Sequence, residues 1–292
     1  MIHCEQLTRQ DETGGVFDLD MHVDKGQALG LLGPAGSGKS LAVGLLMGFL
    51  KKDSGSAAMF GKDCWTMRHE IQRRVAYAPS EPSLEPFVTG EEYLRFAAKY
   101  QGGFDPEKAR RFTERLDVSL TGLCARMSPE AQKKLRLLAA FSLDRDVLIL
   151  DEPMNMLSVL SKDAVYDAVH QATQRGCAVF MTSHVLEETR RACTHIAIIR
   201  QGRLVISQPV EALNLTRQKV YHITFETANQ AASFAGEWES AVEVSGARAL
   251  VAIPGSPQVL LKALARYTVV DLVGGREASE EGFLRFYGDD IV

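Results

Sequence analysis

Long apolar runs are missing from this sequence of 292 residues: the longest, Leu41–Leu50, has ten residues, too few to span a bilayer. The first residues, MIHCEQLTRQDETGG, have neither a basic cluster nor an apolar stretch, so we expect no signal peptide. Basic charge is not in excess either, because 33 Lys and Arg stand against 37 Asp and Glu, for a net charge of −4. This balance argues against a broad basic face and predicts that nucleic acid is not a partner.

Cysteines are few and widely spaced, and their number, five, is odd. No CxxC pair occurs, so we expect neither a disulfide framework nor a cysteine metal site, and a reducing cytosol fits this usage. We expect each thiol to act as a small buried hydrophobe. The five are Cys4, Cys64, Cys124, Cys177 and Cys193.

Hydrophobic residues make up 46% of the chain and charged residues 24%, which indicates a folded protein, and the length predicts two domains. Residues 80–141 are expected to be mostly helical, because Thr89, Asp105 and Ser128 each have the sequence context of a helix N-cap. Buried strands separated by helices predict a mainly parallel α/β sheet around this segment. These strands are Ala28–Leu32, Val147–Leu150, Ala178–Met181 and Ile196–Ile199.

A second unit is expected from residue 217, so that the first domain covers residues 1–216 and the second 217–292. The hydrophobic pattern between Lys219 and Val273 predicts the order βαββαβ, a small ferredoxin-like α+β domain. A last helix is predicted over Ser279–Tyr287.

A glycine-rich loop lies between the strand Ala28–Leu32 and an apolar helix predicted over Lys39–Leu50. It matches GxxxxGK[ST], in which backbone N–H groups surround phosphates, the lysine reaches the β- and γ-phosphates and the last hydroxyl binds Mg²⁺. The eight residues expected to hold a nucleoside triphosphate are Gly33, Pro34, Ala35, Gly36, Ser37, Gly38, Lys39 and Ser40.

Two carboxylates, Asp151 and Glu152, directly follow the strand Val147–Leu150. Together with Ser40, Asp151 is expected to hold Mg²⁺, as the carboxylate at the end of a Walker B strand does. Glu152 is placed to polarise an attacking water. His184 follows the next strand, Ala178–Met181, and is expected to contact the γ-phosphate at the same edge of the sheet.

In the order of these motifs, the chain resembles the ATP-binding subunits of ABC transporters. The segment Ser279–Gly288 is similar to the C-terminal end of ATPases of ABC-2 type exporters. The resemblance implies a P-loop NTPase fold, with a RecA-like, mainly parallel sheet and a helical subdomain over about 80–141. It also implies ATP and Mg²⁺ as cofactors and a second ATP-binding subunit in a head-to-tail dimer. An integral membrane permease subunit would hold the chain at the cytoplasmic face of the membrane.

Several positions depart from the family pattern. The signature LSGGQ aligns with Met127–Ala131, which keeps Ser128 for the partner's nucleotide but places Pro129 and Glu130 at the two glycines. Proline has no N–H to donate, and a carboxylate 4 Å from a phosphate charge is repelled by about 4 kcal/mol at an effective dielectric constant of 20. Ser80 stands at the Q-loop glutamine and Ser158 at the D-loop aspartate.

No aromatic residue is evident at the position that stacks on adenine in the family. Phe17 is an alternative, but its alternation with Leu19 and Met21 favours packing in the core.

Because the partner-facing motifs are changed and the chain's own phosphate-binding motifs are kept, we expect one half of an asymmetric ATPase heterodimer. Glu152 and His184 would be its catalytic residues, and the resemblance of Ser279–Gly288 to exporter ATPases implies export as the direction. The alternative is a nucleotide-binding regulatory subunit with little ATPase activity. A GTPase is disfavoured, because the sequence has no NKxD motif.

Overall fold

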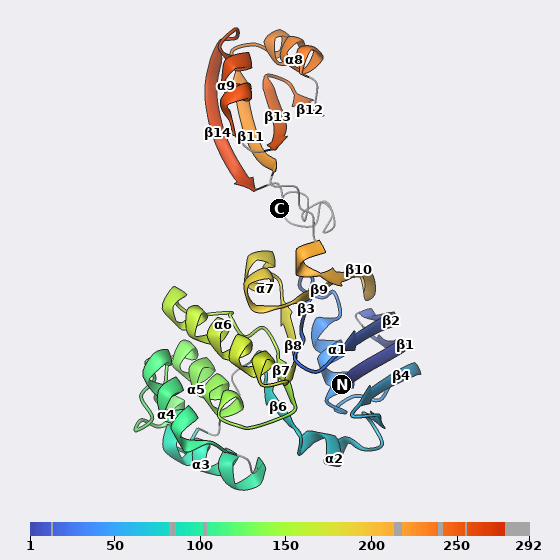
Figure 1. Ribbon diagram of the computed structural model, residues 1–292, viewed down its shortest axis with the longest axis vertical. Helices are drawn as coiled ribbons and strands as arrows, with labels where there is room; N and C mark the ends of the chain where they lie inside the picture. Colours follow the sequence, from blue (N-terminus) through green and yellow to red (C-terminus); the bar gives the residue numbers. More distant parts are fainter. Residues whose placement is uncertain are drawn as a thin grey trace. The chain divides into compact units, whose positions relative to one another are not determined.

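The computed structural model describes residues 1–277 except 13, 82–83, 85, 102–103, 213–217, 239–241 and 255. The chain divides into two compact units, Met1–Val210 and Glu211–Val292 (Figure 1). The domain boundary expected at 216/217 and the helix expected over Ser279–Tyr287 lie outside the described residues. None of the helices in the described part of the chain has the length and apolar composition that crossing a membrane requires.

A six-stranded sheet forms the centre of the first unit, with the strand order β10-β9-β3-β8-β7-β6. All neighbours pair in parallel except β9 and β10. Its inner strands are continuous apolar runs, as expected for strands buried on both faces. The mainly parallel sheet predicted from the sequence is therefore confirmed. Its strands are β3 (Ala28–Leu32), β6 (Val75–Ala78), β7 (Val147–Leu150), β8 (Ala178–Ser183), β9 (His195–Arg200) and β10 (Arg203–Pro209).

An antiparallel sheet with the order β2-β1-β4-β5 also belongs to this unit, and the sequence did not predict its strand β1. The expected core position of Phe17 is wrong, because the pairing of β1 with β2 contains register shifts and Asp18 has φ +51°. This bulge places Val16 in the core and leaves Phe17 half-exposed. The strands are β1 (Ile2–Asp11), β2 (Gly14–Val23), β4 (Ser54–Met59) and β5 (Lys62–Asp63).

Helix α1 ends four residues earlier than the sequence pattern predicts. Gly48 has φ +68°, and the N–H groups of Gly48 and Phe49 donate to the carbonyls of Leu45 and Gly44, as in a Schellman C-cap. The helices of the first unit are α1 (Lys39–Leu46), α2 (Arg68–Gln72), α3 (Gly90–Gln101), α4 (Pro106–Leu116), α5 (Pro129–Phe141), α6 (Val159–Gln174) and α7 (Leu186–Ala192), with a short 3₁₀ turn at Cys124–Arg126. A second 3₁₀ turn, Val210–Ala212, begins at the last residue of this unit.

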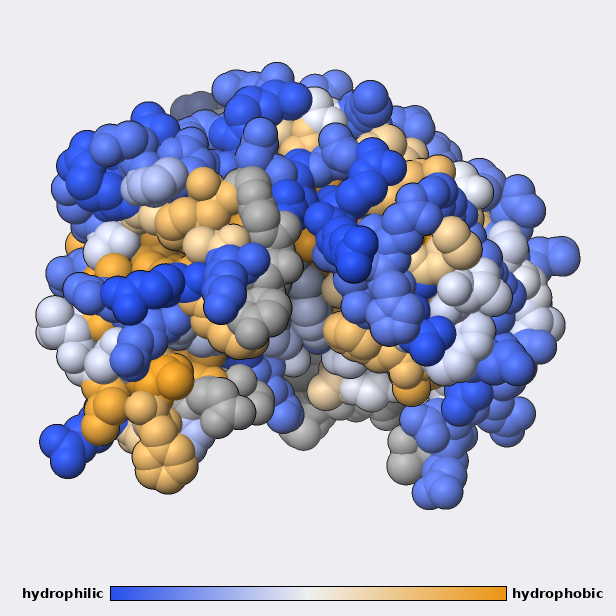
Figure 2. Space-filling view, turned by 90° about the horizontal axis from the view of Figure 1, so that it is seen from below, coloured by the Kyte–Doolittle hydropathy of each residue, from blue (hydrophilic) through white to orange (hydrophobic). Residues whose placement is uncertain are grey.

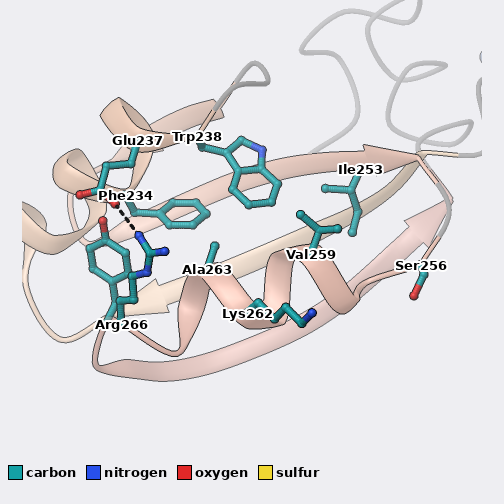
Figure 3. A pocket seen from close by; sticks show the side chains of 10 residues that line it. Phe234, Glu237, Trp238, Ile253, Ser256, Val259, Lys262, Ala263 and Arg266 are labelled. Atoms are coloured by element: carbon teal, nitrogen blue, oxygen red, sulfur yellow. Dashed lines mark ion pairs between the residues drawn. The ribbon is translucent and has the colours of Figure 1, made fainter.

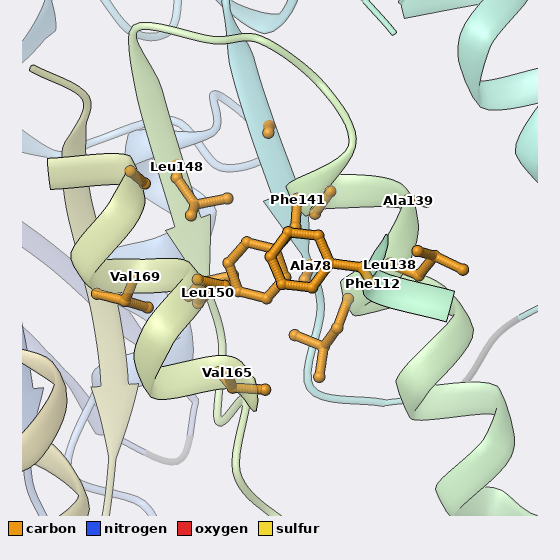
Figure 4. Close-up of a cluster of buried hydrophobic side chains, with 14 of the residues drawn as sticks. Ala78, Phe112, Leu138, Ala139, Phe141, Leu148, Leu150, Val165 and Val169 are labelled. Atoms are coloured by element: carbon orange, nitrogen blue, oxygen red, sulfur yellow. The ribbon is translucent and has the colours of Figure 1, made fainter. Parts of the chain in front are cut away.

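Two hydrophobic clusters cover opposite faces of the central sheet. Leu148 and Leu150 of β7 pack with α4, α5 and α6 (Figure 4), whereas Val147 and Ile149 face α1 and the antiparallel sheet. This alternation is the period of two that a strand imposes. The ring of Phe112 stacks on that of Phe141, with centroids 5.4 Å apart, and so joins the helical segment to the sheet.

The described part of the second unit is a four-stranded antiparallel sheet with the order β12-β13-β11-β14 and two helices. Phe225, Phe234 and Tyr267 pack together in its core. The elements are β11 (Gln218–Phe225), α8 (Ala228–Glu237), β12 (Val242–Ser245), β13 (Arg248–Pro254), α9 (Gln258–Leu264) and β14 (Val269–Glu277).

Candidate functional site

The carboxyl ends of β3, β7 and β8 meet at one edge of the central sheet. Leu32 pairs with Ser183, and Leu150 pairs with Met181, so the three strands end at nearly the same level. The glycine-rich loop follows β3, Asp151 and Glu152 follow β7, and His184 follows β8. In open α/β sheets ligands bind at this edge.

The loop between β3 and α1 needs its glycines. Gly36 and Gly38 have φ +75° and +103°, in the left-handed region that glycine adopts without strain. A Cβ atom at Gly33 would lie 2.5 Å from the carbonyl oxygen of Ile199, so the loop packs closely on β9. Ala35, Gly36 and Ser40 are exposed, whereas the Ser37 hydroxyl is buried without a hydrogen-bond partner.

Lys39, Glu152 and His184 lie together, although they come from three different segments. The Lys39 ammonium donates to the carbonyls of Gly33 (2.6 Å) and Pro34 (2.9 Å) and lies 3.3 Å from Glu152 Oε1. Glu152 Oε2 lies 2.8 Å from His184 Nδ1. The Lys39 side chain is 7% exposed and the Glu152 side chain 16%, so the carboxylate bridges a buried cation and an exposed imidazole.

Asp151 is held by a threonine that the sequence analysis did not single out. The Thr182 hydroxyl donates to Asp151 Oδ1 (2.5 Å) and accepts from the Glu152 N–H (2.9 Å). Thr182 thus orients both acidic residues from the neighbouring strand. Glu152 has φ +48°, an uncommon conformation for a residue with a side chain, and such strain concentrates at functional sites.

The donor set fits Mg²⁺ bound together with a nucleotide. Mg²⁺ takes one or two protein oxygens and completes its shell with phosphates and waters, and Asp151 and Ser40 offer a carboxylate and a hydroxyl. In the described parts of the chain, no group of three or more His, Cys, Asp or Glu side chains could hold a metal ion. An all-protein metal cage is therefore absent from those parts.

Ser128 and Glu130 make contacts within their own chain. The Ser128 hydroxyl accepts from the Ala131 N–H (3.2 Å) and caps α5. Glu130 Oε1 accepts from the Ser158 N–H (3.1 Å) and lies 3.2 Å from Lys134 Nζ. The Ser158 hydrogen bond is the main cause that lowers the pKa of Glu130. These contacts offset part of the carboxylate charge and so weaken the repulsion of a phosphate expected from the sequence.

No hydrogen bond among the described residues joins Ser128 to Lys39, Glu152 or His184. The structure thus brings Lys39 of the loop together with Glu152 and His184 at the strand ends, and the role of Ser128 at the nucleotide of a partner subunit stays a prediction.

The second unit contains a cavity of about 550 Å³ between α8 and α9 (Figure 3). Phe234, Trp238 and Ile253 form apolar walls, and the cavity is also lined by Lys262 of α9 and by Arg266, two residues after the end of this helix. Arg266 pairs with Glu237 across the cavity at 3.9 Å. None of the residues predicted for the nucleotide lines this cavity.

Comparison with known proteins shows that the chain is similar to ATP-binding subunits of ABC transporters. A family model described as "ABC transporter" matches residues 16–155. "Nod factor export ATP-binding protein I" of Burkholderia thailandensis is 30% identical over 203 residues, which are 68% of this chain and 66% of that protein. "SkfA peptide export ATP-binding protein SkfE" of Bacillus subtilis is 30% identical over 211 residues, 70% of this chain and 87% of that protein.

Among solved structures, one described as "Structure of ATP binding subunit of ABC transporter" superposes with a TM-score of 0.67. It is 23% identical, and the match covers 73% of this chain and 91% of that one. This similarity shows that the two chains share a P-loop α/β fold.

Proposed function

Because the chain belongs to the family of ABC transporter ATP-binding proteins, we propose that it binds Mg-ATP at the edge formed by β3, β7 and β8. We further propose that hydrolysis there drives transport, in the direction of export, through a separate membrane subunit. The contact between Lys39, Glu152 and His184 is the observation that carries the proposal. A cation, a carboxylate and an imidazole meet beside a loop shaped for phosphates.

We propose a role for each residue, supported by its position in the site. The backbone N–H groups of the loop and the N-terminus of α1 bind phosphate oxygens, and Lys39 moves from the carbonyls of Gly33 and Pro34 to the β- and γ-phosphates. Glu152 then orients and deprotonates the attacking water, while His184 contacts the γ-phosphate. Mg²⁺, when bound, neutralises the phosphate charge that develops during transfer, and Asp151 and Ser40 are the residues that would hold it.

Mg-ATP titration tests the binding step. Substitution Lys39→Ala removes a charge-assisted contact of about 1.5–3 kcal/mol, so we expect the Kd for ATP to rise about 10- to 100-fold. Substitution Glu152→Gln should leave binding intact and lower turnover by about 10²- to 10⁴-fold, the usual contribution of a general base. A flat titration with the wild-type chain contradicts the proposal.

We also propose that this chain forms one half of an asymmetric heterodimer. Its own phosphate-binding residues are complete, but Pro129 and Glu130 replace the glycines that a partner's nucleotide would meet, and Ser128 caps its own helix. A different ATP-binding subunit with an intact signature would complete the site at Lys39. The reciprocal site, built on Pro129 and Glu130, would be weak.

Turnover of the purified chain, alone and mixed with the second ATP-binding subunit, tests this arrangement. We expect slow hydrolysis alone and faster hydrolysis in the mixture. Brisk hydrolysis by the chain alone that disappears in the Glu152→Gln variant speaks against an obligatory heterodimer.

A second candidate function is a regulatory subunit that binds nucleotide and hydrolyses it hardly at all. It is favoured by the Ser158–Glu130–Lys134 contacts, which occupy the signature segment within the chain. Turnover of the assembled complex that is unchanged by Glu152→Gln identifies this function instead.

We propose that the membrane subunit docks beside the segment 80–89 at the cytoplasmic face of the membrane. Phe87 is 87% exposed there, and Phe96 of α3 is 58% exposed. Hydrophobic side chains gather on the side of the molecule that carries α3 and α4, at the left of Figure 2. Exposed apolar groups of this size are typical of protein–protein contacts.

A further inference from the structure

Helix α5 carries two cationic side chains into the interior. Lys133 is 0% exposed and Arg136 is 2% exposed, and they are the two largest fully buried side chains of the described residues. Burying a cation costs a large desolvation free energy that an apolar residue of similar volume avoids. Packing alone therefore does not account for a lysine at this place.

The Lys133 ammonium donates to three main-chain carbonyls that belong to two separate segments. Its acceptors are Pro79 (3.3 Å), Ser80 (3.2 Å) and Asp151 (3.2 Å). Pro79 and Ser80 follow β6, and Asp151 follows β7. Lysine has three N–H donors, so this arrangement uses all of them. Burial, together with the neighbouring charge of Arg136, lowers the pKa of Lys133 to about 8.

Arg136 lies about one turn after Lys133 in α5 and binds the next residue of the same segment, Glu81. Its Nη1 donates to the carbonyl of Glu81, while its Nε and Nη2 are buried without a hydrogen-bond partner. Three consecutive carbonyls, from Pro79 to Glu81, are thus held by two cations of one helix. The proposed docking segment begins at residue 80, and its first residues are bound to α5 through their backbone carbonyls. This contact does not depend on which side chains the segment carries.

We propose that Lys133 is a positioning residue for the Mg²⁺-nucleotide site. Its ammonium fixes the main chain of Asp151 to that of Pro79 and Ser80, and so sets where the Asp151 carboxylate stands. The inference rests on the proposed function, since Asp151 is the carboxylate that would hold Mg²⁺. Two side chains then orient this aspartate: Thr182 binds its carboxylate, and Lys133 binds its carbonyl. Its N–H donates in addition to the carbonyl of Ala78 (2.9 Å).

The same ammonium provides a direct link from the nucleotide site to the segment beginning at Ser80. If Asp151 moves when Mg-ATP binds, the Lys133 ammonium that donates to its carbonyl must move as well. The same ammonium donates to the carbonyls of Pro79 and Ser80, so these residues are displaced too. Side-chain contact from residue 80 is not needed for this link, because both acceptors are backbone atoms. A serine can therefore occupy the position without breaking it.

The test compares ATP binding in excess Mg²⁺ with ATP binding in EDTA, using the full chain. The readout is the ratio of the two dissociation constants, which measures how much Mg²⁺ tightens binding. Substitution Lys133→Met should reduce this ratio about tenfold, the usual effect of losing a group that orients a metal ligand. The Kd measured in EDTA should stay unchanged, because Lys133 contacts the backbone of Asp151 and not the phosphate-binding loop.

Two further variants separate positioning from simple stabilisation. Lys133→Arg keeps a cation with several N–H donors and should restore most of the wild-type ratio. Lys108→Met is the matched control, because Lys108 is a half-buried lysine of α4 whose pKa is also lowered by burial. It should leave the ratio at the wild-type value, and thermal melting of every variant reports on folding.

A folded Lys133→Met variant with the wild-type ratio overturns the inference, and so does an equal loss in Lys108→Met. Should Lys133→Met not fold, Lys133→Gln takes its place: an amide has only two N–H donors, so a reduced ratio is expected and an unchanged ratio overturns the inference. A wild-type chain that binds ATP in neither condition overturns the proposed function itself. That outcome is distinct, because it is seen before any variant is made.

Discussion

Phe17 is a half-exposed ring beside the phosphate-binding loop. Its N–H donates to the carbonyl of Gly202 (2.8 Å), and the Gly202 N–H donates to the carbonyl of Ser37 (3.0 Å). The guanidinium carbon of Arg203 lies 5.5 Å from the ring centroid. The bulge in β2 that removes this ring from the core therefore leaves it where an adenine base could stack.

We expect Phe17→Ala to weaken ATP binding, because stacking of a base on an aromatic side chain contributes about 1–3 kcal/mol. Binding of inorganic tripolyphosphate should not change, since it has no base. Phe17→Tyr keeps the ring and should bind ATP as the wild type does. Equal losses of affinity for ATP and tripolyphosphate in Phe17→Ala contradict a stacking role, and competition titrations measure both.

The sequence predicted the residues of the site that lie within recognisable motifs, and the structure brings Lys39, Glu152 and His184 together. It did not indicate Thr182 or Lys133, because Asp151, the residue that both contact, lies 31 and 18 residues away from them along the chain. One signal was present for Lys133: helical spacing places it on the same face as Leu137 and Ala140, both apolar. A lysine on an apolar helix face is buried with its neighbours, so its ammonium needs a hydrogen-bond acceptor in the interior of the protein.

Elements with regular patterns were found where the sequence predicts them, for example β7 and the helices α4 and α5 with their N-caps. Strand β1 was missed because its buried positions do not keep a period of two. Ile2 and Cys4 are buried, but the next buried residue is Leu7, after Gln6 with φ +43°. Helices α2 and α7 have five and seven residues, too few for a helical period to be evident.

The turn between β5 and α2 depends on one carboxylate, that of Asp63. It accepts hydrogen bonds from the N–H groups of Trp65 and Thr66 and pairs with Lys52. Burial alone would raise the pKa of Asp63, but the hydrogen bonds from Lys52 and Thr66 outweigh it and lower the pKa to about 2.

A carboxylate whose pKa is lower in the folded state stabilises the fold above its unfolded pKa, near 4, and loses that contribution as the pH falls toward 2. We therefore expect Asp63→Asn to lower the free energy of unfolding at pH 7, and this difference from the wild type to shrink between pH 4 and pH 2. Urea unfolding at a series of pH values measures it. A difference that is constant with pH shows that the charge of Asp63 is not what stabilises the turn.

At the scale of the whole assembly, docking on the membrane subunit is expected to depend on Phe87. Substitution Phe87→Asp places a charge on an apolar contact and should abolish co-purification with the membrane subunit. ATP affinity should stay at the wild-type value, because Phe87 lies outside the phosphate-binding loop. Val259→Asp, at an exposed apolar residue of α9, controls for a general effect of added surface charge. Unchanged co-purification of Phe87→Asp shows that the docking site lies elsewhere.

The contact between Lys39 and Glu152 affects the order of events in the proposed ATPase cycle. The ammonium already has an anionic neighbour, so an arriving triphosphate competes with a carboxylate rather than filling a free position. Entry of the nucleotide and release of Glu152 are then one exchange of anions. In the proposed function, Glu152 therefore becomes available to orient a water only after the phosphates have displaced it from Lys39.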